Sequence, residues 1–180
     1  MRYFWLSFFL LLAGCGREPL VQSQSYVFGT LVDISIYGES EERAHQVSNE
    51  IFQDFQKLHH QYHAWQKGSE LYQLNEAFSQ GKSIQVTPEL REILEEATVL
   101  SKQSKGLFNP AIGGLIREWG FQRDEFTPID IHPETIKKLI NANPSMSDIV
   151  MDGDKVYSRN SAVQLDLGGY AKGYALDKAA

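Results

Sequence analysis

The sequence contains a single cysteine, Cys15, among its 180 residues. One cysteine cannot form an intramolecular disulfide, so its thiol is either free or modified. Positive charge is also scarce, because 17 lysines and arginines are opposed by 23 aspartates and glutamates, which gives a formal net charge of −6. This balance argues against a nucleic-acid-binding protein, since such proteins depend on clustered basic side chains.

The longest apolar run, residues 3–12, is shorter than the roughly 20 residues that a membrane-spanning helix needs. It follows the cationic Arg2 and precedes the sequence "LAGC", which matches the cleavage box of bacterial lipoproteins. We therefore predict a signal peptide over residues 1–14, lipidation of Cys15, and a polar tether over residues 15–25. A slightly short transmembrane anchor is the alternative.

Three common functional motifs are absent. The sequence has no GxxxxGK[ST] phosphate loop, no GxGxxG dinucleotide fingerprint and no HExxH zinc motif. His59 and His63 are four residues apart and His60 lies between them, a spacing that would suit zinc. A solvated histidine face is the alternative, and the missing HExxH pattern favours it.

Periodic patterns predict an α+β fold in one domain over residues 26–180. Residues 30–38 alternate between apolar and polar side chains, as in a half-buried strand. Apolar side chains recur every three or four residues over 41–62, 87–106 and 133–140, which predicts amphipathic helices. Three short strand-like runs follow from residue 147, and Asp152-Gly153 predicts a hairpin between the first two. We expect the helices to pack on a mainly antiparallel sheet.

Two segments in the middle of the chain combine aromatic residues with polar or glycine residues. In "AWQKGSELYQLN", Trp65 precedes the pair Ser69-Glu70, which either caps a short helix or stands beside an aromatic wall for a ligand. In "GLFNPAIGGLIREWGF", the glycines would let the backbone approach a flat ligand. A helix face explains Leu115, Ile116 and Trp119, whereas Leu107, Phe108 and Asn109 remain candidate ligand contacts.

The last segment, "DLGGYAKGYALDKAA", predicts a strand, a glycine turn and the start of a helix. Unpaired N–H groups at such a helix start attract anions, and Lys172 would add a positive charge suited to phosphate. A tight packing joint with a solvated lysine explains the same residues equally well.

Taken together and in order, these segments resemble the ApbE-type FAD:protein FMN transferases, whose fold has a T-fold-like core. "FGTLVDISIYG" stands where that family has Met-Gly-Thr and a strand, and the other three segments match its remaining motifs. The resemblance implies a magnesium ion, to which Gly169 contributes an oxygen ligand. It also implies FAD as the substrate, bound by Phe28, Trp65, Leu107, Phe108, Asn109, Asp166 and Lys172.

The implied reaction cleaves FAD, releases AMP and attaches FMN to a threonine or serine hydroxyl of an acceptor protein, such as a subunit of a membrane redox complex. The resemblance further implies a lipid-anchored protein on a bacterial membrane, facing the periplasm, with the inner membrane favoured. Phe28 replaces the usual methionine and Asn109 the common aspartate. Members of the family continue beyond the equivalent of Ala180, and that later part supplies further metal ligands. We therefore expect that residues 26–180 form an incomplete transferase domain. A non-catalytic FAD-binding lipoprotein and a lipoprotein adaptor are the alternatives.

Overall fold

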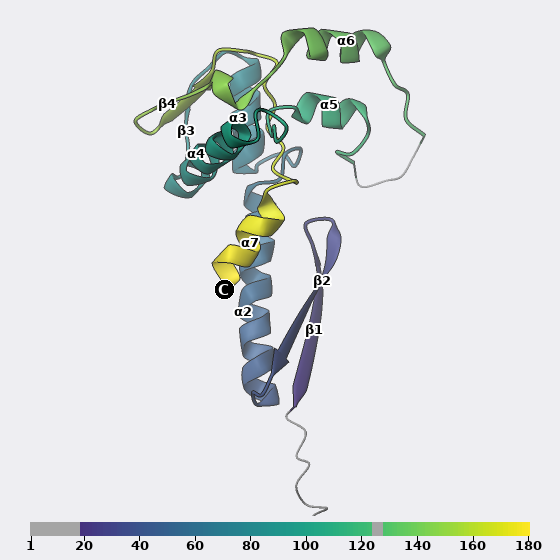
Figure 1. Ribbon diagram of the computed structural model, residues 1–180, viewed down its shortest axis with the longest axis vertical. Helices are drawn as coiled ribbons and strands as arrows, with labels where there is room; N and C mark the ends of the chain where they lie inside the picture. Colours follow the sequence, from purple (N-terminus) through teal and green to yellow (C-terminus); the bar gives the residue numbers. More distant parts are fainter. Residues whose placement is uncertain (1–18, 124–127) are drawn as a thin grey trace, which may run out of the picture. The chain divides into compact units, whose positions relative to one another are not determined.

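The computed structural model describes residues 19–123 and 128–180. The predicted signal peptide and the predicted lipidation site, Cys15, lie outside the described residues. The chain divides into two compact units, Met1–Phe55 and Gln56–Ala180, and each is described by itself (Figure 1).

The first unit contains an antiparallel hairpin of strands β1 (Leu20–Val27) and β2 (Thr30–Tyr37). Its turn consists of Phe28 and Gly29, with φ angles of 54° and 69°. Positive φ at both central residues is typical of the two-residue turns that match the twist of paired strands. The predicted strand at residues 30–38 is confirmed.

Strand β1 departs from the expected organisation, because residues 20–25 belong to it and the predicted tether reached residue 25. The alternation of this strand was not visible in the sequence because two of its less exposed residues are serines. The less exposed face consists of Val21, Ser23, Ser25 and Val27. Ser23 and Ser25 share that face with two valines, so the apolar period of a strand is broken in the sequence.

Helix α2 (Glu41–Gln61) follows the hairpin and continues across the boundary between the two units. The predicted apolar stripe is confirmed at Ala44, Phe55 and Leu58, which are buried, and Tyr62 is buried just beyond the helix end. Ser48 and Phe52 are buried on the same helix, so the buried face is wider than the predicted stripe.

The second unit begins with two capped helices. Helix α3 (Glu70–Ser79) starts where the Ser69 side chain accepts a hydrogen bond from the Tyr72 N–H. Helix α4 (Pro88–Gln103) starts in the same way, with Thr87 as the N-cap and Pro88 at the first helical position. The start at Thr87 was predicted, and the cap at Ser69 was one of the two interpretations of its segment, because a hydroxyl that satisfies an unpaired N–H is a local signal.

Short strands and helices complete the second unit. Strand β5 (Lys155–Ser158) pairs antiparallel with both β3 (Ile84–Gln85) and β4 (Ile149–Asp152). The β4–β5 pairing confirms the predicted hairpin at Asp152-Gly153. The helices are α5 (Gly113–Glu118), α6 (Pro133–Ala142), the 3-10 helix η1 (Met146–Asp148) and α7 (Ala171–Ala179).

The third strand-like run of this region was predicted to join the antiparallel sheet, and this prediction is wrong. Residues 163–167 are extended, but their only bridge among the described residues is a parallel one between Gln164 and Ile112. Val163, Leu165 and Leu167 are buried, so the alternation was real and the partner was misassigned. They share the core of this unit with residues of α3 and α4, among them Leu71, Leu74, Phe78, Leu90, Ile93 and Leu94.

Within the described ranges, no helix is both long enough and apolar enough to cross a membrane.

Candidate functional site

Two of the segments singled out in the sequence lie side by side in the second unit. The N–H of Asp166 donates to the Pro110 carbonyl over 2.9 Å, and the N–H of Gly113 donates to the Gln164 carbonyl over 2.7 Å. The aromatic loop that begins at Gly106 and the strand that leads into the Gly168-Gly169 turn are thereby joined. Residues more than 50 positions apart in the sequence form one site.

Gly113 allows this close approach, and a side chain there should weaken it. A Cβ atom at position 113 would lie 2.7 Å from the backbone oxygen of Gln164, which cannot rotate away. We expect Gly113→Ala to lower the free energy of unfolding by about 1–3 kcal/mol, measured by urea denaturation of the full-length gene product. The matched control is Gly173→Ala in helix α7, where a Cβ meets nothing within 4 Å. Equal stability of the Gly113→Ala variant and the unchanged protein would refute the close approach.

A buried asparagine holds the strand from its other side. Asn75 of α3 is 5% exposed, and its side chain accepts from the Leu165 N–H over 2.6 Å and donates to the Leu165 carbonyl over 2.9 Å. The side-chain amide of Asn75 therefore acts as a strand partner for Leu165. Asn75 ends the segment "AWQKGSELYQLN", but the sequence alone indicated no role for it. Its position four residues after the buried Leu71, on the same helix face, was a usable signal.

The Asp166 carboxylate is held in one orientation. One oxygen accepts from the Gly168 N–H over 2.9 Å, and the other accepts from the side-chain amide of Gln122 over 2.8 Å. The first contact is a local turn of the kind that aspartate favours, and the second comes from the segment after α5. Gln122 is a site residue that the sequence prediction missed, since it lies outside the four motifs.

A cavity of about 470 Å³ opens beside the glycine turn, and Phe108 and Gly169 both line it. It includes Tyr170 and Tyr174 of the α7 region and Glu96 of α4. Burial and the Glu96 carboxylate, which accepts a hydrogen bond from the tyrosine, raise the pKa of Tyr170. Two of the predicted FAD and magnesium positions thus face the same space.

Three other predicted residues lie nearby with different roles. Leu107 is 93% exposed, and Lys172 is exposed in the first turn of α7. Asn109 donates to the Pro144 carbonyl over 2.9 Å and accepts from the Ala111 N–H over 3.1 Å. An aspartate could not make the first of these bonds because it has no N–H to donate, so asparagine at this position has a structural reason.

Phe28 and Trp65 are not among the residues that line this cavity. Phe28 belongs to the first unit, where its ring lies 5.9 Å from that of Phe55. Trp65 lies between α2 and α3, with its ring 4.2 Å from that of His63. Both remain predicted contacts of FAD, which no geometry of the described residues tests.

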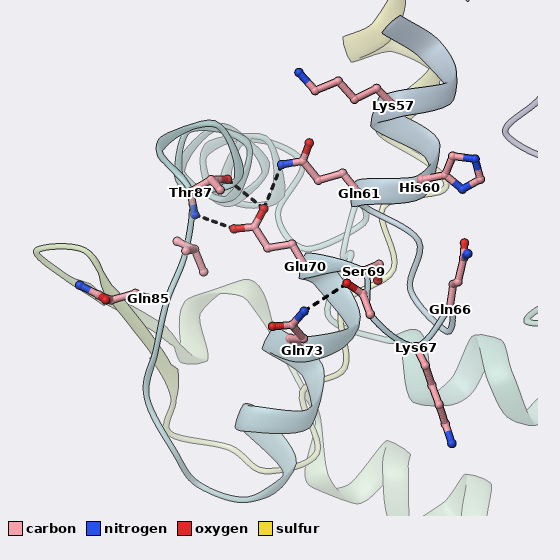
Figure 2. A pocket seen from close by; sticks show the side chains of 12 residues that line it. Lys57, His60, Gln61, Gln66, Lys67, Ser69, Glu70, Gln73, Gln85 and Thr87 are labelled. Carbon is pink, nitrogen blue, oxygen red and sulfur yellow. Dashed lines mark hydrogen bonds between the residues drawn. The ribbon is translucent and has the colours of Figure 1, made fainter. Parts of the chain in front are cut away.

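The Ser69-Glu70 pair starts helix α3, with Ser69 as the N-cap, which was one of the two interpretations of the sequence. Glu70 accepts from the Thr87 hydroxyl over 2.9 Å, from the Thr87 N–H, and from the Gln61 side chain over 3.1 Å, as Figure 2 shows. These bonds connect the end of α2 with the starts of α3 and α4. An open cavity of about 900 Å³ surrounds them, but the amino groups of Lys57 and Lys67 point away from Glu70.

The described residues offer little to a metal ion. Across residues 19–123 and 128–180, no three or more His, Cys, Asp or Glu side chains are grouped so that they could hold one. His59 and His63 contact each other edge to face, with ring centroids 5.0 Å apart. Gly169 is exposed in open space, yet one backbone oxygen does not make a magnesium site, because Mg²⁺ takes an octahedral set of oxygens.

The fold and site define an α+β protein in which an aromatic loop and a glycine turn form one ligand-sized cavity. The model of the ApbE family matches residues 28–180. The chain belongs to the ApbE family.

Two relatives are described as FAD:protein FMN transferases. The protein from Rhodobacter capsulatus is 41% identical over 181 residues, which cover 94% of this chain and 33% of that protein. The protein from Treponema pallidum is 29% identical over 172 residues, which cover 91% and 47%. The chain thus spans less than half the length of either relative.

Solved structures confirm the predicted α+β fold class. The ApbE protein of Thermotoga maritima superposes with a TM-score of 0.79 at 23% identity, covering 89% of this chain and 51% of that chain. The apo form of the Pseudomonas stutzeri flavinyl transferase ApbE gives a TM-score of 0.74 at 21% identity, covering 90% and 52%. At these identities the likeness concerns the fold alone.

Proposed function

We propose that this protein is an FAD:protein FMN transferase. The hydroxyl of a threonine or serine on an acceptor protein attacks the phosphorus on the flavin side of FAD. A phosphoester forms, the bond between the two phosphates breaks, and AMP leaves with the electron pair of that bond. The hydroxyl gives up its proton as the new bond forms.

The observation that carries this proposal is the meeting of the aromatic loop with the glycine turn. Phe108 and Gly169 line one cavity, and the exposed Leu107 lies next to Phe108 in the loop. Apolar side chains beside a cavity of this size suit one flat ring system of FAD. Lys172 would supply positive charge for the pyrophosphate, and Asp166, with both oxygens anchored, offers a fixed acceptor for N–H or O–H groups of the ligand.

Magnesium dependence is part of the proposal and rests on the chemistry of the reaction. When bound, Mg²⁺ would supply positive charge that stabilises the phosphate groups of FAD. Gly169 would contribute one backbone oxygen. We also propose that the protein is lipidated at Cys15, since "LAGC" follows a short apolar run. The family resemblance supports the further proposal that it is anchored to the bacterial inner membrane, facing the periplasm, and that its acceptor is a membrane redox subunit.

The test is a transfer assay with the full-length gene product, FAD, Mg²⁺ and an acceptor protein that carries an exposed threonine. We expect AMP and a flavin-labelled acceptor in equal amounts, detected by chromatography and by flavin fluorescence of the denatured acceptor. An acceptor whose threonine is replaced by alanine should stay unlabelled. FAD binding without AMP release or labelling would reject the transferase and leave a flavin-binding protein.

A further inference from the structure

Two tyrosines hold the start of helix α7 against helix α4. The Tyr170 hydroxyl donates to the Glu96 carboxylate, and the Tyr174 hydroxyl donates to Glu89 over 3.3 Å. The two tyrosine rings stack with centroids 5.7 Å apart. We call these four side chains the tyrosine–glutamate clamp. It connects positions 74 and 85 residues apart in the sequence.

The backbone also holds the beginning of α7, since the N–H groups of Tyr170 and Ala171 donate to the Leu167 carbonyl over 2.9 and 2.7 Å. Ala175 is the helix's one buried residue, and Cβ atoms at Gly169 and Gly173 would meet nothing within 4 Å. Tyr170, by contrast, is 8% exposed and stands immediately after the Gly168-Gly169 turn. The contact of its side chain with Glu96 connects the turn and the first helical turn to α4, in addition to the backbone bonds to Leu167.

The clamp also sets the direction of Lys172. Residues four apart lie on the same face of a helix, so Tyr170 and Tyr174 both face α4. Residue 172 is rotated about 200° from residue 170, which directs Lys172 away from α4. Its exposure agrees with this direction.

We propose that the hydrogen bond between Tyr170 and Glu96 positions Lys172 for FAD binding. Both residues line the cavity beside the glycine turn, but the Tyr170 hydroxyl donates to Glu96 rather than to a ligand. This inference rests on the proposed function only in taking FAD as the ligand of the site. Tyr174 and Glu89 support the same arrangement one turn later.

The test measures the dissociation constant of FAD by quenching of flavin fluorescence, with the full-length gene product. Tyr170→Phe should weaken FAD binding about three- to tenfold, the value of one hydrogen bond. In a Lys172→Met background, the same change should cause no further loss, because the pair acts through the lysine. An equal loss in both backgrounds would overturn the proposal, as would unchanged affinity of the single variant.

Variants at Glu96 separate the hydrogen bond from the charge and do not depend on the Tyr170 variant being folded. Glu96→Gln keeps an acceptor oxygen and should bind FAD as the unchanged protein does, whereas Glu96→Ala should match Tyr170→Phe. Equal affinities of Glu96→Gln and Glu96→Ala would contradict the inference. Tyr157→Phe, on strand β5, is the matched control and should leave FAD affinity unchanged.

The two proposals fail in different ways. Binding of FAD without transfer of FMN rejects the proposed function and leaves the clamp testable, because the readout is affinity. If the unchanged protein does not bind FAD, both proposals are rejected.

Discussion

Replacing Asn75 by alanine should lower the free energy of unfolding by about 2–4 kcal/mol. The side chain is buried and bonds to both backbone polar groups of Leu165. Alanine would leave the N–H and the carbonyl of Leu165 without these partners in a place that water does not readily reach. Each unsatisfied buried group costs about 1–3 kcal/mol. Urea denaturation followed by far-UV circular dichroism measures the loss.

The matched control is Glu76→Ala, at the next position of the same helix, where the side chain is exposed. It should change stability by less than about 0.5 kcal/mol. Asn75→Asp should also be destabilised, because a carboxylate can accept from the Leu165 N–H but cannot donate to its carbonyl. If Asn75→Ala were as stable as Glu76→Ala, the side chain could not be the partner that holds the strand leading to Asp166.

Replacing Lys172 by alanine should weaken FAD binding by about tenfold to a hundredfold. A hydrogen bond to a charged group contributes about 1.5–3 kcal/mol, and tenfold in affinity corresponds to about 1.4 kcal/mol. Lys172 is exposed in the described residues, so its removal should leave the stability of the fold unchanged. Fluorescence quenching of FAD measures the affinity, and thermal unfolding checks the fold.

Lys178→Ala is the matched control on the same helix, since that lysine lies 5.3 Å from the centre of the Tyr174 ring and away from the glycine turn. It should bind FAD normally. The affinity lost in Lys172→Ala should also shrink as salt is added, because screening weakens the attraction between lysine and phosphate. Unchanged FAD affinity of Lys172→Ala at low salt would remove the lysine from the site.

Local signals in the sequence predicted most helices and turns. Thr87 followed by Pro88 marked the start of α4, and Asp152-Gly153 marked the hairpin of β4 and β5. These two predictions were correct because a cap or a turn involves groups that are only a few residues apart in the sequence. The same holds for Ser69, whose hydroxyl accepts from an N–H three residues later.

The site was predicted less completely. The motifs singled out Phe108 and Gly169, and both line one cavity. They did not point to Gln122, which holds Asp166, or to Glu96, which holds Tyr170. A glutamine after a helix and a glutamate on an exposed helix face are ordinary in any sequence, and only their distant partners make them specific.

What the sequence by itself determined is the type of most helices and turns, the family resemblance and the candidate ligand residues. Periodicity and capping are properties of neighbouring residues, so they can be read without the fold. The tertiary structure alone decided which elements meet. Residues 163–167 have the alternation of a strand in any sheet, yet they lie beside residues 110–113 because Gly113 permits the approach and Asn75 occupies the other side. Backbone groups are the same in every residue, so their partners depend on the packing of the whole unit.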